Sequence, residues 1–290
     1  MSLDAHFHAW QPARGDYGWL TPALGPLWRE VQVPHWWHEA APHGVQGGVL
    51  VQAAPTAAET DFLLAQAAAH PRVLGVVGWV DLTAPDAPAQ VRARAAQPRL
   101  VGLRPMLQDL ADTDWIAQPA VQPALAAMAE CGLVLDALIQ PRHLPVLQQV
   151  ARAHPGLRIV IDHGAKPRMD AASAPGSAAW QAWAQGLQAL ADLAPHGRIV
   201  CKLSGLWTEA PAGQPCAHVQ AWAQALLQIW GPQRLLWGSD WPVLEQAGPY
   251  AAWWAHTQAL LAPLSPAERQ AVLGENARRV YRLEDPLRPP

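Results

Sequence analysis

The sequence has few charged residues and lacks long uncharged apolar runs. Charged residues make up 15% of its 290 residues and the formal net charge is −3, so its charge does not attract nucleic acid or an anionic membrane over long range. No uncharged apolar run reaches the roughly 18 residues that a membrane-spanning helix needs. The opening MSLDAHFHAW has neither a basic head nor an apolar stretch, which argues against a signal peptide.

Cysteine is also scarce, and its pattern matches no disulfide or zinc motif. The three cysteines are Cys131, Cys201 and Cys216. An odd and widely spaced set is a poor disulfide framework and has no zinc-finger spacing. We therefore expect a protein of a reducing compartment, the cytoplasm, without nucleic-acid or membrane partners. The number of subunits stays open, a homodimer being one option.

The usual motifs of covalent catalysis and nucleotide binding are missing. The chain contains no GxSxG elbow, no GxGxxG and no Walker loop, so serine-nucleophile and phosphate-cradling chemistry have no support here. Cys201 directly precedes Lys202, and alternation along a strand then points its thiol to the opposite face. Covalent catalysis is therefore disfavoured.

What the chain does contain is a series of short apolar runs that alternate with longer segments rich in Ala and Gln. The runs cover 3–9, 47–53, 73–80, 100–105, 132–139, 157–163, 198–205 and 234–240. Each is rich in Val, Leu or Ile without strict alternation, as expected of strands buried on both faces. The segments between them resemble helices. Segment 56–70 has Thr56 as an N-cap and Glu59 in the capping-box position, and 221–231 ends at Gly231.

These eight runs and the helical segments between them predict an α/β fold with a parallel sheet, because parallel neighbours need long crossovers. In 290 residues without a linker, a single-domain (β/α)8 TIM barrel over 1–290 fits better than an open doubly wound sheet. We expect the irregular segments 10–35 and 164–178 to be loops on the active face, the first over the barrel mouth.

The barrel predicts that chemistry lies at the C-terminal ends of its strands. Polar side chains gather at those ends, and a buried strand has no structural need to finish in an ionisable group. They are His6, His8, Gln52, Arg104, Asp136, His163, Lys202 and Asp240.

His6 and His8 are two residues apart on the first predicted strand, so alternation places both imidazoles on one face. With the carboxylate of Asp240 they suit a divalent metal; the alternative is a pair satisfied by hydrogen bonds. Asp240 precedes Trp241 and a proline, and it suits a general base toward water or, alternatively, a helix N-cap. His163 is a candidate general acid or base, metal ligand or oxyanion donor, against an ordinary buried histidine.

Further residues are candidates for contact with a ligand. Cations at strand ends suit a ring carbonyl, hydroxyls or a carboxylate; the alternative is that each merely pairs with Asp136, Asp162 or Asp240. Tryptophans supply flat apolar walls. The candidates are Arg104, Lys202, Gln52 and Asp136, with Trp10, Trp79 and Trp241 as pocket walls.

Seven segments carry a family resemblance over nearly the whole chain. They are DAHFHAW (4–10), GLRPMLQD (102–109), LDALIQPRHL (135–144), IVIDHGAKP (159–167), CKLSG (201–205), WGSDWPV (237–243) and GENARRVYRL (274–283). In this order and spacing the sequence resembles the amidohydrolase superfamily, in its amidohydrolase-2, lactonase-like branch. Members of that branch include L-fuconolactonase-like and L-rhamnonolactonase-like sugar lactonases and 2-pyrone-4,6-dicarboxylate lactonase.

The resemblance implies the barrel, hydrolysis of a lactone, and His6, His8, His163 and Asp240 as the positions to carry over. One departure is informative. Many metal-dependent members place a carboxylated Lys, a Glu or another His at strand four or five, where this chain has Arg104 and Asp136. We therefore expect at most one divalent metal, such as zinc, on His6, His8 and Asp240, and leave open whether the reaction needs it.

We therefore expect an enzyme, a lactonase that opens a small sugar-acid lactone. Asp240 takes a proton from water, which attacks the carbonyl, while the three histidines stabilise the oxyanion, and His163 or Lys202 helps to protonate the leaving alkoxide. A neutral lactone is favoured over a dicarboxylate because the loops are not strongly basic. Two alternatives are a metal-dependent decarboxylase or amide hydrolase of the same superfamily, and a catalytically inactive barrel that binds a small molecule.

Overall fold

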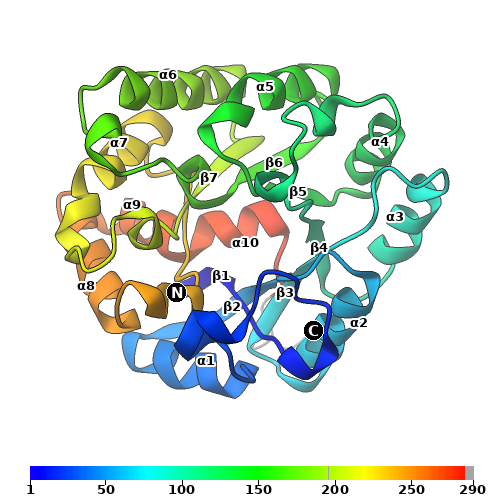
Figure 1. Ribbon diagram of the computed structural model, residues 1–290, viewed down its shortest axis with the longest axis horizontal. Helices are drawn as coiled ribbons and strands as arrows, with labels where there is room; N and C mark the ends of the chain where they lie inside the picture. Colours follow the sequence, from blue (N-terminus) through cyan, green and yellow to red (C-terminus); the bar gives the residue numbers. More distant parts are fainter. Residues whose placement is uncertain (195, 285–290) are drawn as a thin grey trace.

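The computed structural model describes residues 1–194 and 196–284. Eight parallel strands pair in sequence order from β1 to β8, and helices surround them as a ring (Figure 1). The predicted (β/α)8 barrel is confirmed, and each of the eight apolar runs overlaps one strand. The strands are β1 Ser2–Phe7, β2 Val45–Val51, β3 Val73–Gly78, β4 Leu100–Leu103, β5 Val134–Ala137, β6 Arg158–Ile161, β7 Ile199–Leu203 and β8 Leu235–Trp237.

Each strand is followed by a helix that returns the chain to the start of the next one, and two further helices follow the last unit. A π-helical turn at Ala271–Glu275 joins these two. The helices are α1 Val33–Ala40, α2 Ala57–Ala69, α3 Ala87–Ala95, α4 Gln122–Cys131, α5 Leu144–Ala153, α6 Ala178–Leu193, α7 Gln220–Trp230, α8 Tyr250–Leu261, α9 Pro266–Gln270 and α10 Asn276–Tyr281.

The predicted helix signals are partly confirmed. Helix α7 ends before Gly231, as expected. Thr56 caps α2, its hydroxyl accepting from the Glu59 N–H at 3.0 Å. The reciprocal half of the predicted capping box is wrong, because the Glu59 carboxylate turns away to accept from the N–H groups of Ala53 and Ala54 at 2.7–3.0 Å. Those bonds hold the loop between β2 and α2 instead.

Two apolar layers pack on the strands. The outer layer lies between strands and helices, and Cys201 belongs to it. The inner layer fills the barrel below the polar strand ends, and α10 contributes Val280 and Tyr281 to it, so this helix covers the N-terminal end of the barrel (Figure 1). Lys202 faces inward, opposite to Cys201, as alternation predicts, and burial raises the pKa of the Cys201 thiol.

Strands β1 and β8 close the barrel. Phe7 and Trp241 form a parallel bridge, the Asp240 N–H donates to the His6 carbonyl at 2.8 Å, and the His8 N–H donates to the Trp241 carbonyl at 2.8 Å. The closure therefore lies directly under the residues that the sequence nominates for chemistry.

Asp4, fully buried on β1, completes this closure. Its Oδ1 accepts from the N–H groups of Ser239 and His6 at 2.8 and 3.2 Å. Its Oδ2 accepts from Ser239 Oγ at 2.6 Å, Trp36 Nε1 at 2.9 Å and Tyr250 Oη at 3.2 Å. One carboxylate thus joins β1, α1, the end of β8 and α8.

The two irregular segments contain short turns rather than extended loops. Segment 10–35 includes 3-10 turns at Pro12–Arg14 and Pro22–Leu27 and the start of α1, and segment 164–178 includes a turn at Ala171–Ser173. Across the part of the chain that the structure describes, the helices are too short or too polar to cross a membrane.

We predict that Asp4→Asn lowers the free energy of unfolding by about 2–4 kcal/mol, because an amide NH2 then faces buried N–H and O–H donors. Urea unfolding followed by circular dichroism measures this. Asp192→Asn is the matched control: Asp192 is exposed on α6, and its change should stay within about 0.5 kcal/mol. Equal stability of the two variants would contradict the proposed role of Asp4.

Candidate active site

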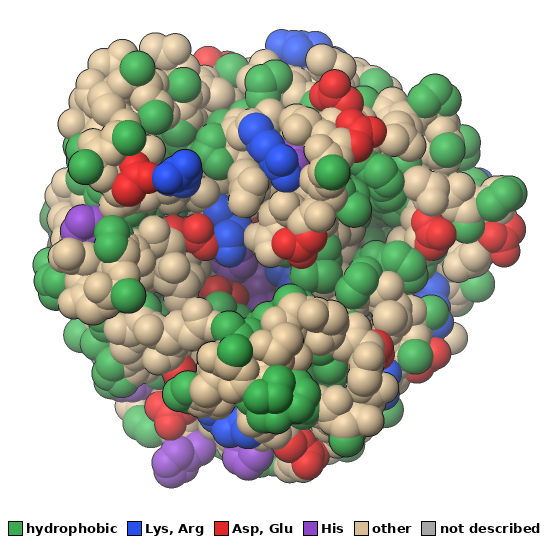
Figure 2. Space-filling view, viewed as in Figure 1, with side chains coloured by type: hydrophobic (Ala, Val, Ile, Leu, Met, Phe, Trp, Pro, Cys, Tyr) green, Lys and Arg blue, Asp and Glu red, His purple; other side chains and the backbone are tan. Residues whose placement is uncertain are grey.

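A cavity of about 290 Å³ opens at the C-terminal ends of the strands. Figure 2 shows a hollow in this face with histidine, acidic and basic side chains at its bottom. Both irregular segments reach the cavity, as predicted, through Trp19, Leu24 and Lys166. It is lined by His8, Trp19, Leu24, Ala53, Arg104, Met106, Gln108, Asp109, Leu138, His163, Lys166, Asp240, Val243 and Gln246.

The centre of the site is a group of three side chains from the closure of the barrel. His6 Nε2 and His8 Nε2 lie 3.2 Å apart, and Asp240 Oδ1 lies 3.6 Å from the first and 3.3 Å from the second. All three side chains are buried. The sequence placed both imidazoles on one face and Asp240 beside them, and the structure brings them together.

These three atoms fit a divalent metal. Two ligand atoms on a tetrahedral zinc ion are about 3.3 Å apart, close to the observed 3.2–3.6 Å. His8 Nδ1 lies 2.8 Å from the Val51 carbonyl oxygen. A carbonyl only accepts, so Nδ1 carries the proton and Nε2 presents its lone pair to the site, which is the usual arrangement behind a metal-bound histidine.

His163 approaches the same carboxylate from β6. Its Nε2 lies 3.8 Å from Asp240 Oδ1, and its Nδ1 is hydrogen-bonded to the buried Ser204 hydroxyl at 2.9 Å. Burial lowers the pKa of His163 to about 4, although the carboxylates of Asp240 and Asp162 act in the opposite direction. The imidazole is therefore neutral at pH 7.

An unusual backbone turn presents His163. Residues His163, Gly164, Ala165 and Lys166 all have positive φ, between 46° and 63°, and the Lys166 N–H donates to the His163 carbonyl at 2.9 Å. This is one turn of left-handed helix, which costs roughly 1–2 kcal/mol for each residue with a Cβ. Trp183 Nε1, on α6, stabilises the turn by donating to the Gly164 carbonyl at 2.7 Å.

The Asp240 carboxylate is ionised in these surroundings. Burial by itself would raise the pKa of Asp240, but the neighbouring His163, His8 and His6 outweigh it and hold that pKa below its usual range. Burial and the positive charge of Lys202 hold the pKa of His6 well below its usual value. The site therefore pairs one ionised carboxylate with the neutral imidazoles of His6 and His163.

Lys202 lies one layer below the cavity. It is fully buried, and its Nζ lies 2.6 Å from Asp136 Oδ2, 2.9 Å from Asp162 Oδ1 and 3.0 Å from His6 Nδ1. The Tyr281 hydroxyl, from α10, donates to Asp136 at 2.9 Å. Lys202 and Asp136 were candidates for ligand contact, but this position favours the alternative, an ion pair that supports His6 from beneath.

Arg104 does line the cavity, and Gln52 supports it. Arg104 Nη1 lies 3.3 Å from Asp162 Oδ2 and 3.4 Å from His6 Nε2. Arg104 Nη2 donates to the carbonyl oxygen of Gln52 and, at 3.1 Å, to its Oε1. Gln52 Nε2 returns a bond to the Arg104 carbonyl at 3.0 Å. Gln52 is fully buried, so its geometry favours orienting the guanidinium over touching a ligand.

Comparison with known proteins agrees with this geometry. The profile of the Amidohydrolase family matches residues 3–283. This chain belongs to that family. It is 43% identical over 288 residues to the L-fucono-1,5-lactonase of Burkholderia ambifaria, covering 98% of this chain and 96% of that protein. It is 35% identical to the L-fucono-1,5-lactonase of Burkholderia multivorans, covering 99% and 97%.

Solved structures agree on the fold of this amidohydrolase. A crystal structure of an amidohydrolase from Burkholderia multivorans with bound zinc superimposes with a TM-score of 0.89 at 33% identity, covering 98% of this chain and 100% of that one. A probable 2-pyrone-4,6-dicarboxylic acid hydrolase from Acinetobacter baumannii superimposes with a TM-score of 0.78 at 20% identity, covering 97% and 99%. At that identity the second likeness shows the fold alone.

The tryptophan prediction identified the wrong wall of the pocket. Among the described residues, Trp19 lines the amidohydrolase cavity, whereas Trp10, Trp79 and Trp241 do not. Trp10 is buried behind Trp19, the two rings meeting edge to face at 5.4 Å, and its Nε1 donates to the carbonyls of Leu27 and Arg29. Trp241 Nε1 donates a hydrogen bond to Glu245 Oε1 at 2.9 Å. Trp10 thus braces the wall from behind.

Sequence reasoning also missed residues whose signal was present. Asp4 and Ser204 lie within the segments DAHFHAW and CKLSG, but neither faces the cavity. Ser204 contacts the ring of His163, and Asp4 bonds the backbone N–H of His6. Gln108 and Asp109 end the segment GLRPMLQD and line the cavity. A search of the residues just beyond each strand end would have found these two.

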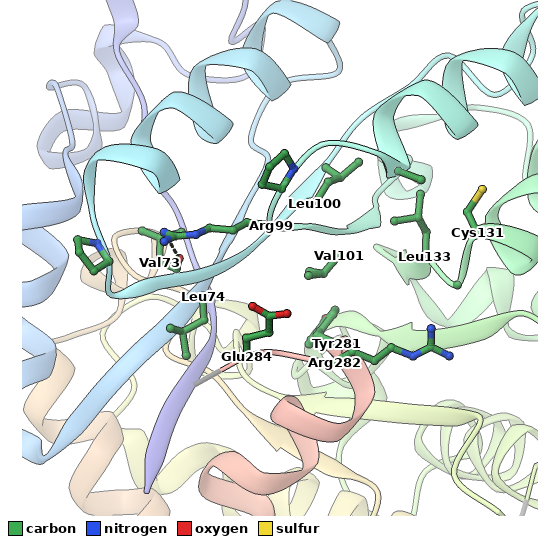
Figure 3. Close-up of a pocket in the computed structure, with 14 residues that line it drawn as sticks. Val73, Leu74, Arg99, Leu100, Val101, Cys131, Leu133, Tyr281, Arg282 and Glu284 are labelled. Atoms are coloured by element: carbon green, nitrogen blue, oxygen red, sulfur yellow. Dashed lines mark hydrogen bonds between the residues drawn. The ribbon is translucent and has the colours of Figure 1, made fainter. Parts of the chain in front are cut away.

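The opposite end of the amidohydrolase barrel has a cavity of its own, of about 500 Å³. Figure 3 shows it between the starts of β3, β4 and β5 and the end of α10, with Glu284 pointing into it. The Arg99 guanidinium there is bonded to the carbonyls of Ala67, His70 and Val73. None of the predicted site residues lines this cavity, which matches the rule that the N-terminal face of a barrel serves stability.

We predict that Gly205→Ala lowers kcat/KM about 100-fold or more, because a Cβ at Gly205 would lie 2.4 Å from His163 Nδ1 and displace the ring. Steady-state kinetics on a hydrolysed lactone measures this. Gly213→Ala is the matched control, since Gly213 also has positive φ but has nothing within 4 Å of a new Cβ. It should lose about 1 kcal/mol of stability and keep its activity; equal activity losses in both variants would contradict the steric argument.

Proposed function

We propose that this amidohydrolase opens a sugar-acid lactone, with L-fucono-1,5-lactone as the first substrate to test. The observation that carries the proposal is the Asp240 carboxylate, held among three imidazoles at the bottom of a cavity. The two curated relatives named L-fucono-1,5-lactonase support the same reaction. They do not favour a decarboxylase, an amide hydrolase or an inactive binding barrel.

In the proposed reaction Asp240 takes a proton from water, and the water oxygen attacks the ring carbonyl carbon. Asp240 is ionised, as a proton acceptor must be. The carbonyl oxygen becomes an oxyanion, and donors placed in advance stabilise it in the water-poor bottom of the cavity. Arg104 and the imidazoles of His6 and His163 surround that place. The carbonyl–ring-oxygen bond then breaks, and the proton held by Asp240 passes to the ring oxygen.

Ser204 gives His163 its role in this scheme. When the Ser204 hydroxyl donates to His163 Nδ1, the neutral ring carries its proton on Nε2, the atom that points toward Asp240. A neutral donor of this kind stabilises an oxyanion without competing for the base. We therefore assign His163 to oxyanion stabilisation through its Nε2–H group, and Asp240 to activation of water and return of that proton to the leaving oxygen.

Metal binding belongs to the proposal in a limited form. A zinc ion held by His6, His8 and Asp240 would polarise the carbonyl and lower the pKa of a bound water. The guanidinium of Arg104, 3.4 Å from His6 Nε2, already supplies a positive charge at the same place. We propose that the reaction proceeds without the metal.

The scattered cysteines support a cytoplasmic location, and the profile match over 3–283 supports one domain.

We predict that the wild-type protein opens L-fucono-1,5-lactone faster than other aldonolactones, followed with a pH indicator, and that Asp240→Asn lowers kcat at least about 1000-fold by removing the base. Asp109→Asn is the matched control, because Asp109 lines the same cavity but stands at its exposed rim; it should keep most of the activity. Full activity of Asp240→Asn, with unchanged circular dichroism, would exclude Asp240 as the base.

We predict that the protein retains at least about half of its kcat after dialysis against a chelator, because Arg104 and the imidazoles of His6 and His163 remain as electrophilic donors. The metal content is measured by mass spectrometry before and after dialysis, and the kinetics are repeated after zinc is added back. Activity that disappears with the metal and returns with zinc would make His6, His8 and Asp240 obligatory metal ligands.

A further inference from the structure

Each cation of the catalytic cavity, histidine aside, has a carboxylate partner. Among the described residues that line it, the cations other than histidine are Arg104 and Lys166. Arg104 is paired with Asp162, and Lys166 Nζ lies 2.7 Å from Glu209 Oε1. The acids Asp109 and Asp240 also line the cavity, and neither has a Lys or Arg partner among the described ion pairs. Lys166, like Arg104, is therefore held in an ion pair, and its ammonium group is engaged by Glu209.

The Lys166–Glu209 pair occupies a position where it can act on a ligand. Lys166 ends the left-handed turn that begins with His163, so its backbone is held relative to the reacting centre. Its side chain lies between the catalytic cavity and a neighbouring one of about 450 Å³, and it lines both. Glu209 lines the neighbouring cavity, in a 3-10 turn at Trp207–Glu209 after β7.

This pair is partly accessible to solvent, the side chains of Lys166 and Glu209 being 20% and 21% exposed. Without Glu209 the ammonium group of Lys166 would stand without this partner at the edge of the catalytic cavity. A free ammonium binds a carboxylate by a charge-assisted hydrogen bond, which is about twice as strong as a neutral one. The cavity therefore discriminates against carboxylate-bearing ligands only while Glu209 keeps the Lys166 ammonium group in an ion pair.

We propose that Glu209 is a positioning residue for specificity: it engages Lys166 and so keeps the cavity selective for lactones that carry no carboxylate. The inference rests on the proposed function and adds to it a residue that favours neutral lactones over lactones that carry a carboxylate. Glu209 acts through Lys166 and does not line the catalytic cavity itself. The same arrangement weakens the hold on the aldonate anion that ring opening produces.

The test measures the binding of a dianion that has no lactone ring, galactarate, by titration calorimetry. In Glu209→Gln the dissociation constant for galactarate should fall about tenfold or more. The ratio of this dissociation constant to the KM of the neutral lactone should fall as well. The gain should shrink as salt is raised, because it is electrostatic and partly exposed. A merely structural role of Glu209 would weaken both ligands and show no such salt dependence.

Two further variants locate the effect. Lys166→Met combined with Glu209→Gln should abolish the gain, because no cation is left to release. Glu130→Gln makes the same chemical change on α4. Glu130 pairs with Arg92, the two atoms being 2.8 Å apart, and does not line the cavity. The Glu130→Gln protein should bind galactarate as the wild type does. An unchanged dissociation constant in Glu209→Gln, a gain that survives in the double variant, or an equal gain in Glu130→Gln would each overturn the proposal.

The proposed function and this inference fail separately. Galactarate binding is measured without turnover, so it reports on Glu209 even in a protein that opens no lactone. A wild type that hydrolyses L-fucono-1,5-lactone, with no tighter galactarate binding in Glu209→Gln, keeps the proposed function and discards the role of Glu209. A wild type that opens no lactone, with tighter galactarate binding in the variant, does the reverse.

Discussion

The geometry of the site depends on one buried positive charge. Lys202 lies between Asp136 and Asp162 with no access to solvent, and it also contacts His6. A buried charge is tolerated only when it is paired and hydrogen-bonded, and loss of one partner leaves the other uncompensated. Because Asp162 also holds Arg104, this ion cluster determines the positions of a cation in the cavity and of a histidine beside the base.

Backbone strain is concentrated at the same place. Asp240 has φ of 59°, and the turn from His163 to Lys166 is left-handed throughout. Conformations of this kind persist only where the surroundings hold them. Here the surroundings are identifiable: Trp183 bonds the turn, and Ser204 bonds the ring of His163. His163 and Lys166 begin and end this turn and both line the cavity, so the catalytic and the specificity-bearing side chains share one support.

The fold was predictable because burial on both faces leaves a strong mark on a strand. Eight apolar runs gave eight strands, and the polar residues at their ends gave His6, His8, His163 and Asp240 together. Depth was not predictable. Lys202 and Asp136 lie within β7 and β5, one residue before each strand ends, whereas Arg104 follows the last residue of β4. The apolar runs do not show where each strand ends to within one residue, and that residue decides which layer a side chain occupies.

Loops were the other limit. Trp10 and Trp19 belong to the same segment, and only the path of the chain through its 3-10 turns decides that Trp19 reaches the cavity and Trp10 supports it from behind. Glu59 shows the same limit at a helix start. Its spacing from Thr56 fits a capping box, but its carboxylate accepts hydrogen bonds from the N–H groups of Ala53 and Ala54 in the preceding loop instead. A local sequence pattern indicates which hydrogen bonds are possible, and the tertiary structure determines which of them form.

The closure of the barrel through Asp4 also determines when the active site can exist. Asp4 bonds residues 235 and 246 positions away, and His8 meets Asp240 across 232 positions. During synthesis the two histidines of β1 are made 232 or more positions before the carboxylate that they meet. Contacts of such long range make folding slow and leave apolar strands uncovered meanwhile. The active site therefore cannot form until β8 and the residues that follow it through Asp240 have been made.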